Sequence, residues 1–246
     1  MKILVCVTRV PDTTSKISFK NKNMEFDSDG VQYIIGPYDD YALARAVEIK
    51  ESISSAYVSV LNVGLNESDV ILRKALAIGA DDAFRIDADP LDSSYVAFQI
   101  SSFIKSNPYD LIMMGKESID FNGGVVHYMV GELLRISCVN PVMNLEINKN
   151  IVNIKREVDT GIEELEGHLP LVIGCQEPIA EWKIPNMRGI MSARSKPLNI
   201  IQPFDYVSKF FYSSFDLPLK KESVKFIDSE NLEELIDHLK NDAKVI

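Results

Sequence analysis

The sequence is poor in cysteine, and the few cysteines form no pattern typical of a metal site or a disulfide framework. Cys6, Cys138 and Cys175 are the three cysteines among 246 residues, and no CxxC pair occurs. An odd number of widely separated cysteines argues against a small, disulfide-stapled secreted protein. We therefore expect a reducing, cytoplasmic compartment.

Long apolar runs and an excess of basic residues are also absent. No run approaches the roughly 20 apolar residues that span a membrane, and ILVCV after Met1 and Lys2 is too short for a signal-peptide core. Asp and Glu number 36 against 26 Lys and Arg, which gives a net charge of -10. These totals argue against membrane insertion and general nucleic-acid binding, and favour protein or small-molecule partners.

The sequence offers no recognisable catalytic constellation. His127, His168 and His238 are scattered without metal-ligand spacing. No nucleophile with an adjacent base and no pair of catalytic carboxylates can be assembled by spacing. We expect no catalytic residues and no metal site, and interpret the chain as a carrier component.

What the sequence does contain is an alternation of strand-like and helix-like segments. Apolar runs typical of strands occupy residues 2–10, 57–63, 83–86 and 111–114, and helical periodicity occupies the segments from 39, 66–78, 93–106 and 126–134. This alternation predicts an α/β fold with a doubly wound, mostly parallel sheet. We also expect a helix cap at Asp39 or Asp40 and a left-handed cap at Gly79.

Other segments interrupt or extend this pattern. Polar and apolar residues alternate over 17–35 around Asp29-Gly30, which predicts a peripheral hairpin. Extra strands are expected at 141–147, 151–158 and 169–175, with residues 148–150 and 161–167 as connections.

The C-terminal region carries more large apolar residues than a solvated tail would. They include Phe204, Tyr206, Phe210, Phe211, Tyr212, Phe215 and Phe226. Ser229 is expected to cap a last helix with an apolar stripe. We predict a nucleotide-binding α/β domain over 1–198 and an arm over 199–246 that packs on another subunit.

The stretch from Asp110 to Leu134 is the strongest candidate for a ligand site. A buried strand ends in a polar, glycine-rich loop, and a helix begins near Val126. Free N–H groups and the positive dipole end at a helix N-terminus can hold a phosphate. Lys116 follows Gly115 but no Ser or Thr comes next, so the motif is not a P-loop, and a plain loop with a helix cap stays possible.

Seven segments in order resemble the β subunit of electron transfer flavoprotein, nearly end to end. They read KILVCVTRVPDT, GPYDDYALARAVEIKE, ALAIGAD, DLIMMGKESID, KREVDTGIEELEGHLPLVIG, IPNMRGIMSARSKPL and LKNDAKVI. The resemblance implies a heterodimer in which the α subunit carries the redox FAD. It also implies that the β subunit holds AMP or, in electron-bifurcating members, a second FAD.

The resemblance also assigns residues. Its nucleotide-contact segments correspond to Cys6, Gly36, Pro37, Tyr38, Asp39, Val63, Gly115, Lys116, Ser118, Asp120, Asn122, Gly123, Gly124, Val125 and Val126. Many relatives have a polar Gln-Thr-Gly or Gln-Val-Gly run where this chain has Val125-Val126-His127. We expect the backbone N–H groups of Gly123-Gly124 to bind the phosphate instead.

Two further segments are assigned to partners by the same resemblance. The basic segment 181–197 corresponds to the family's recognition loop for acyl-CoA or related dehydrogenases, with Ile184, Pro185, Asn186, Met187 and Arg188 as docking residues. Arg9, Pro11 and Asp12 correspond to the interface with the flavin-bearing α subunit.

The expected function is therefore that of a β subunit that clamps its partner while the FAD of the α subunit passes electrons from dehydrogenases to a quinone-linked or other acceptor. One alternative is a bifurcating complex with a second FAD that uses NADH. The other is a stand-alone nucleotide-binding protein of the stress type.

Overall fold

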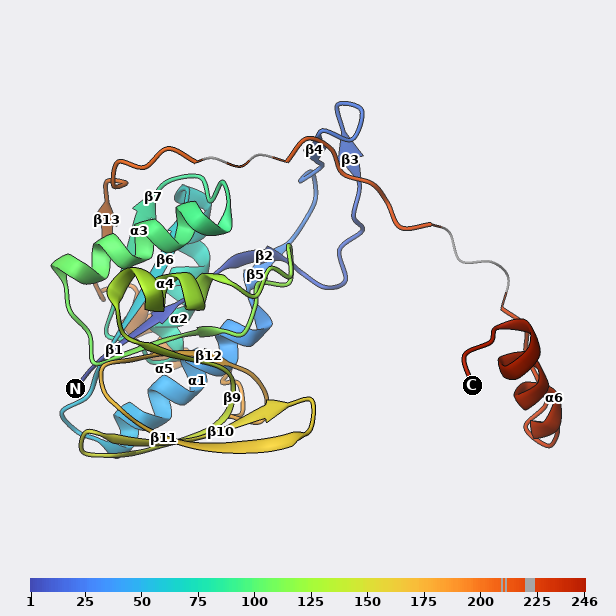
Figure 1. The fold of residues 1–246 in the computed structure, drawn as a ribbon. Coiled ribbons are helices and arrows are strands. Elements are labelled where there is room, and N and C mark those ends of the chain that lie inside the picture. Colours follow the sequence, from blue (N-terminus) through green and yellow to red (C-terminus); the bar gives the residue numbers. More distant parts are fainter. Residues whose placement is uncertain (209, 211, 220–223) are drawn as a thin grey trace. The chain divides into compact units, whose positions relative to one another are not determined.

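The computed structural model describes residues 1–208, 210, 212–219 and 224–246 (Figure 1). They form two compact units, one of Met1–Ile17 with Ser28–Tyr212 and one of Ser18–Asp27 with Ser213–Ile246. Phe211, one of the aromatic residues expected in the arm, lies outside the described residues. That the region from 199 packs on another subunit stays a prediction.

The larger unit is built on a central sheet. Its strands are β1 (Lys2–Cys6), β6 (Tyr57–Gly64), β7 (Asp82–Asp87), β8 (Leu111–Gly115), β9 (Ser137–Asn148), β10 (Ile151–Val158), β11 (Gly161–His168), β12 (Leu171–Cys175) and β13 (Leu198–Ile201). Their order is β11-β10-β9-β12-β8-β1-β6-β7-β13. β10 is antiparallel to both β9 and β11, and the other neighbouring pairs are parallel.

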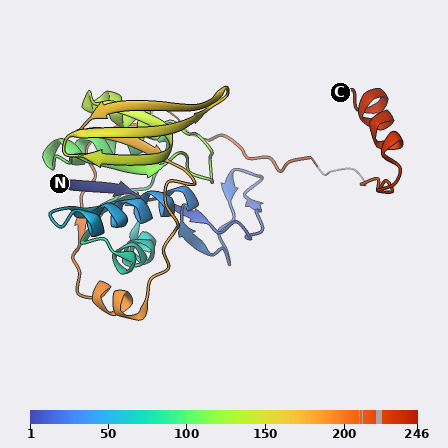
Figure 2. The ribbon, with the colours of Figure 1, turned by 90° about the horizontal axis from the view of Figure 1, so that it is seen from below.

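Helices cover both faces of this sheet (Figure 2). They are α1 (Pro37–Ser52), the 3₁₀ turn η1 (Asn66–Ser68), α2 (Asp69–Ile78), α3 (Ser93–Ser106), α4 (Val126–Leu134) and α5 (Met187–Ala193). Ile3 and Val5 of β1 share a core with α1 and α2, whereas Leu4 and Cys6 share one with α3 and α4. Successive strand residues thus face opposite helix layers, which confirms the doubly wound, mostly parallel α/β fold.

Several boundaries follow from local pattern, and the structure confirms them. α3 and β10 have the predicted limits, and Gly79 ends α2 with a φ of +156°. None of the described helices has the length and apolar character needed to cross a membrane.

A hairpin forms within residues 17–35 as expected, but its turn is not at Asp29-Gly30. The short strands β3 (Phe19–Lys20) and β4 (Glu25–Phe26) pair with each other instead, and β5 (Tyr33–Ile35) pairs with β2 (Arg9–Pro11). The β3–β4 turn uses positive φ at Asn21, Lys22 and Asn23. Asn tolerates this conformation better than most residues, so the turn forms without the Asp-Gly pair.

Two segments expected to be irregular are ordered. Residues 161–168 form the edge strand β11, where the sequence indicated a connection. Its polar residues pair across to β10, with Arg156 Nε 2.5 Å from Glu163 Oε2 and Lys155 Nζ 2.6 Å from Glu164 Oε1. The basic segment 181–197 contains the helix α5.

The predicted helix caps are also corrected. Gly36 is the N-cap of α1, with Pro37 at the start, so neither Asp39 nor Asp40 caps the helix. In the smaller unit, Asn231 rather than Ser229 precedes α6 (Leu232–Asp237), and its side chain accepts a hydrogen bond from the Glu234 amide. A π-helical turn, η2 (His238–Asp242), continues from α6.

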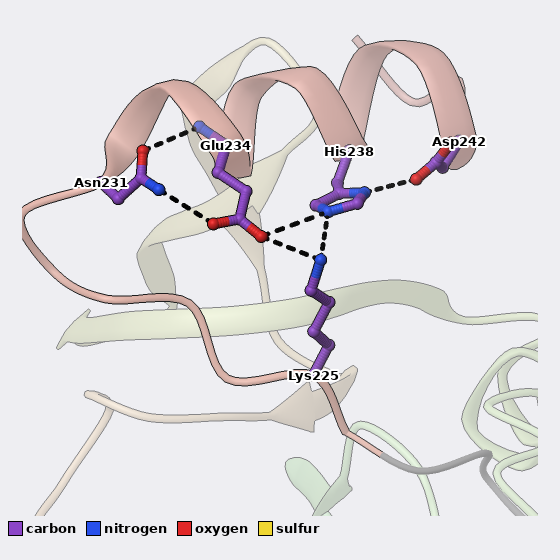
Figure 3. A network of polar contacts seen from close by, with 5 residues as sticks. All are labelled: Lys225, Asn231, Glu234, His238 and Asp242. Carbon is purple, nitrogen blue, oxygen red and sulfur yellow. Dashed lines mark hydrogen bonds and ion pairs between the residues drawn. The ribbon is translucent and has the colours of Figure 1, made fainter.

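Charged side chains join the last helix to the segment before it (Figure 3). Lys225 Nζ lies 2.9 Å from Glu234 Oε1 and 2.5 Å from His238 Nε2, and the His238 ring also contacts Asp242. Such largely exposed contacts contribute little to stability. α6 buries none of its residues, so the apolar side chains of Leu232, Leu235 and Ile236 are exposed.

Candidate functional site

A cavity of about 380 Å³ lies where β1, β6, β7 and β8 end, lined by the segments that follow them. β1 sits between β8 and β6 in the sheet, although β6 follows it in the chain and β8 comes later. The strand order therefore reverses at β1. Parallel α/β sheets bind ligands in the crevice at such a switch point.

Asp39, in the first turn of α1, ties the ends of β1 and β8 together. Its Oδ2 accepts hydrogen bonds from Thr8 N at 2.8 Å and Thr8 Oγ1 at 2.6 Å, and its Oδ1 accepts one from Gly115 N at 2.7 Å. The residue is 3% exposed. Burial raises the pKa of its carboxyl to about 6, although the hydrogen bonds from Thr8 and Gly115 oppose the rise. The carboxylate is thus committed to the protein's own donors.

Two glycines leave room for this carboxylate. A Cβ on Gly36 would lie 2.5 Å from Asp39 Oδ2, and one on Gly115 would lie 2.7 Å from Asp39 Oδ1 and 2.6 Å from Tyr38 Cβ. All three distances are too short for any real contact, so even alanine would displace the carboxylate. Gly36, Tyr38 and Gly115 therefore shape the site through packing.

The loop after β8 ends at a helix whose N-terminus has no side-chain cap. Val125 occupies the N-cap position of α4 and accepts nothing through its side chain. Asp120 Oδ1 accepts from Ser118 Oγ at 2.5 Å and from the Phe121 amide at 2.9 Å, so it braces the loop instead of capping α4. Among the described residues, no side-chain cap accepts from the first-turn N–H groups of α4 beside the cavity, which suits an anion.

A second buried polar group supports the far side of the cavity. Arg85 of β7 is buried, and its Nε lies 2.7 Å from Asp69 Oδ1 while its Nη1 donates to Gly64 O at 3.1 Å. It also contacts Asp87. These bonds hold the end of β6 against β7, and Gly64 is itself a lining residue.

Most of the predicted nucleotide residues meet at the cavity. The lining contains Cys6, Asp39, Val63, Gly115, Ser118, Asp120, Gly123, Gly124, Val125 and Val126, together with Arg9. Gly36, Pro37, Tyr38, Lys116 and Asn122 are not among the lining residues. Lys116 Nζ instead lies 3.1 Å from Gln176 Oε1 and 4.8 Å from the centre of the Tyr38 ring.

The three residues expected at the α-subunit interface lie in or directly after β2 but make different contacts. Arg9 lines the cavity, and its guanidinium carbon lies 3.4 Å from the centre of the Tyr33 ring. Pro11 ends β2. The Asp12 carboxylate accepts hydrogen bonds from the amide and hydroxyl of Thr14, which closes a local turn.

His127 is a lining residue that sequence reasoning left out of the site. It is 1% exposed, and its Nε2 has no hydrogen-bond partner among the described residues. Burial lowers the pKa of the imidazole to about 4, so the ring is neutral at pH 7. Its position directly after Val126, in the first turn of α4, was the available signal.

The other lining residues were not among the predicted site residues, although Glu117 and Phe121 belong to the predicted loop after β8. They follow β1, lie in or after β6, β7 and β8, or belong to α3 or the arm. They are Val7, Thr8, Leu61, Asn62, Gly64, Leu65, Glu67, Ser68, Asp89, Pro90, Leu91, Asp92, Ser93, Val96, Ile100, Met114, Glu117, Phe121 and Tyr212. The general rule that ligand loops follow parallel strands could have found the segments after β6 and β7. No local pattern indicates Tyr212.

The charge of the lining limits what the cavity can hold. Carboxylates come from Asp39, Glu67, Asp89, Asp92, Glu117 and Asp120, and among the described lining residues Arg9 supplies the one side-chain cation. Like charges repel in a confined site, so each added phosphate costs binding energy. This lining favours a ligand with few phosphates.

The segment 181–197 presents apolar side chains on a helical support. Ile184 is 83% exposed and Met187 is 74% exposed. Asn186 caps α5 by accepting from the Gly189 amide at 2.8 Å, and a Cβ on Gly189 would lie 2.3 Å from Ala77 O of α2. The helix therefore packs closely on α2 and buries Ala193, while Met187 and the preceding Ile184 stay exposed.

Main-chain contacts hold this segment in place. Arg73 Nη1 donates to Ala193 O and Lys196 O, both at 2.8 Å, and Lys196 Nζ donates to Leu76 O at 2.9 Å. Lys183 pairs with Glu51 at 3.0 Å. Of the basic residues in the segment, Arg188 and Arg194 are the exposed ones.

Comparison with known proteins shows which family the chain belongs to. Residues 23–204 match the electron transfer flavoprotein domain. The chain is 33% identical to electron transfer flavoprotein subunit β of Bacillus subtilis over 260 residues, with 100% of both chains covered. The chain belongs to the electron transfer flavoprotein β-subunit family.

Two other relatives match this chain over most or all of their length. The mitochondrial β subunit of Arabidopsis thaliana is 32% identical, with both chains fully covered. The CarD subunit of a caffeyl-CoA reductase–Etf complex from Acetobacterium woodii is 29% identical, over 81% of this chain and 78% of that one. Membership of the family implies an α-subunit partner and flavin in the complex.

Proposed function

We propose that the chain is the β subunit of a heterodimeric electron transfer flavoprotein that holds AMP and docks dehydrogenases. The FAD of the α subunit then receives their electrons and delivers them to a quinone-linked or other acceptor. In this proposal the β chain is a carrier component and performs no catalysis of its own.

The observation that carries the proposal is the cavity at the switch point of the sheet. Its volume of about 380 Å³ lies near the small end of the range for ligand pockets, which suits a mononucleotide. The uncapped start of α4 and the Gly123-Gly124 backbone offer N–H groups to one phosphate. The acidic lining disfavours ligands with longer phosphate chains.

The side chains at the cavity support binding rather than redox chemistry. Burial, with a smaller contribution from the charge of Asp39, raises the pKa of the Cys6 thiol. The thiol therefore stays protonated, and a protonated thiol is a poor nucleophile. We expect Cys6 to contact the nucleotide through its backbone.

The exposed apolar residues of segment 181–197 support the docking role. Ile184 and Met187 are exposed apolar residues three positions apart, and Arg188, next in the chain, is also exposed. An apolar anchor with charges at its rim separates affinity from steering in protein interfaces. We propose that a dehydrogenase buries Ile184 while the flavin-bearing partner stays free to move.

The proposal is tested by the ligand content of the heterodimer. The chain is co-expressed with its α subunit, the purified complex is denatured, and the released small molecules are identified by mass. One AMP and one FAD per heterodimer supports the carrier assignment. Two FAD and no AMP would instead assign a bifurcating complex that uses NADH.

The stand-alone alternative makes a different prediction. It requires the chain to purify as a stable monomer with its C-terminal residues protected from proteolysis. The exposed Leu232, Leu235 and Ile236 of α6 favour a partner instead. A stable monomer with a protected C-terminal region would contradict the heterodimer.

We propose the cytoplasm as the compartment, on the basis of the three free cysteines.

A further inference from the structure

Residues 202–208, which follow β13 in the C-terminal arm, are held along α3 by polar and aromatic contacts. Gln99 of α3 is fully buried, and its side-chain amide exchanges two hydrogen bonds of 2.8 Å with the backbone of Phe204. The Tyr206 ring stacks on Phe98 with centroids 4.5 Å apart. Ser208 Oγ donates to the Asp92 carboxylate at the start of α3. The arm is thereby directed to the cavity.

At the cavity, Tyr212 of the arm contacts Phe121 of the loop between β8 and α4. The rings of Phe121 and Tyr212 are stacked, with centroids 4.7 Å apart and planes at 19°. Both line the cavity, and they are 52% and 50% exposed, so the pair stands between the cavity and solvent. Burial and the charges of Asp120 and Asp92 raise the pKa of the Tyr212 hydroxyl, in keeping with a position beside both carboxylates.

We propose that the Phe121–Tyr212 stack retains the nucleotide, so that AMP leaves the cavity when these two rings separate. The proposal rests on the assignment of the cavity to AMP, and it gives a role to Phe121 of the predicted loop and to Tyr212, which lies outside that loop. Because Tyr212 belongs to the arm, AMP occupancy and arm placement become linked. Linkage is reciprocal, so bound AMP also holds the arm against the loop.

The test is the rate at which the complete heterodimer releases radiolabelled AMP into an excess of unlabelled AMP. Aromatic pairs contribute a stabilisation that corresponds to roughly a 2- to 12-fold change in rate. We expect Tyr212→Ala and Phe121→Ala to accelerate release by that factor. Tyr212→Phe keeps the stacking ring and should retain the wild-type rate.

A double variant tests whether Phe121 and Tyr212 retain AMP as a pair or independently of each other. If the rings act as a pair, Phe121→Ala with Tyr212→Ala releases AMP no faster than the faster single variant. Tyr212→Leu serves as a second single variant with a side chain that can still pack. Trp182→Ala, at a 63% exposed aromatic residue of segment 181–197, is the control and should leave the rate unchanged.

The outcomes distinguish this inference from the function it rests on. If the wild-type complex holds AMP and both single alanine variants release it at the wild-type rate, the stack has no retaining role. Additive effects in the double variant would contradict a pair in the same way. A wild-type complex that binds no AMP would overturn the proposed function and this inference with it.

Discussion

The carboxyl edge of the sheet contains buried polar side chains, whereas segment 181–197 leaves apolar side chains exposed. At the edge, Asp39 and Arg85 are buried and bonded to backbone groups far away in the sequence. In the segment, Ile184 just before α5 and Met187 at its start are exposed. A small ligand requires a preformed, rigid cavity, whereas a protein partner can cover apolar surface itself. The difference supports two separate sites in one chain.

The largest loss of stability should come from removing the hydrogen bonds that Asp39 accepts. Asp39→Ala leaves the Thr8 amide, the Thr8 hydroxyl and the Gly115 amide without their acceptor. Unsatisfied buried donors are costly, so we expect the free energy of unfolding to fall by roughly 3 kcal/mol. Urea unfolding of the heterodimer measures the loss, and AMP content should fall with it.

The matched control lies one residue further along the same helix. Asp40 Oδ2 is 3.3 Å from Lys74 Nζ, and that lysine is more than one-third exposed. Asp40→Asn should therefore cost less than about 1 kcal/mol. Equal losses in the two variants would show that Asp39 has no special role at the edge.

A second effect concerns pH and His127. The folded chain keeps this ring neutral with a pKa of about 4, whereas the unfolded chain takes up a proton below about 6.5. The contribution of His127 is therefore full above pH 6.5 and is lost as pH falls toward 4, by up to roughly 3 kcal/mol. Urea unfolding at several pH values should show a smaller acid loss for His127→Leu than for the wild type.

Asp39 changes stability in the opposite direction over much of this range. Its folded pKa of about 6 lies above its unfolded value, so its carboxyl favours the folded state more as pH falls from 6 to 4. The difference between the wild-type and His127→Leu curves isolates the histidine. His168→Gln, at an exposed position of β11, is the control, and an acid loss unchanged by His127→Leu would contradict the assignment.

A smaller effect is expected from the two loop glycines. Gly124 has a φ of +57°, and the nearest atom to a new Cβ is 3.8 Å away, so Gly124→Ala introduces backbone strain without a collision. We expect a stability loss of roughly 1 kcal/mol and weaker AMP retention. Gly124→Val should cost more because its side chain is branched at Cβ.

Gly123 provides the comparison within the same loop. Its φ is not in the left-handed region, and a Cβ would lie 3.5 Å from Ser93 Oγ, an ordinary contact. Gly123→Ala should leave AMP content near that of the wild type, as measured by mass. If both alanine variants lose AMP equally, the backbone conformation of Gly124 does not explain the loss.

The smallest effect on stability is expected at the docking segment. Ile184→Ala removes a side chain that packs on little within the chain, so stability should change by less than about 0.5 kcal/mol. Electron uptake from the dehydrogenase should slow by roughly tenfold, because a buried anchor is lost from the complex. Stopped-flow reduction of the FAD over a range of protein concentrations measures the rate.

Ile162→Ala on the edge strand β11 is the control for this variant, since Ile162 is also an exposed apolar residue. It should leave both the rate and the AMP content unchanged. Wild-type reduction rates in Ile184→Ala at every concentration would remove Ile184 from the docking surface.

The parts of the fold that follow from local pattern could be predicted from the sequence. α3 and β10 have the predicted limits because periodicity and turn residues mark them. β11 was missed because a polar edge strand lacks the apolar run that indicates a buried one. The resemblance to the family, rather than spacing, supplied the recognition segment.

The contacts that build the site were beyond sequence reasoning because they join distant residues. Asp39 bonds to Gly115 across 76 positions, and nothing near either residue indicates the pairing. Val125-Val126-His127 replaces a polar run of the family, which suggested that side-chain contacts to phosphate are lost. The structure places a buried, neutral imidazole there. The stacking of Phe121 on Tyr212 likewise arises only when the arm follows α3.

We propose that the cavity at the carboxyl edge, and not segment 181–197, is the nucleotide site. Photolabelling the heterodimer with radiolabelled 8-azido-AMP, followed by peptide mapping, tests it most directly. We predict label in residues 61–68 or 115–127, suppressed by excess AMP. Label confined to 181–197 or to the partner subunit would contradict it.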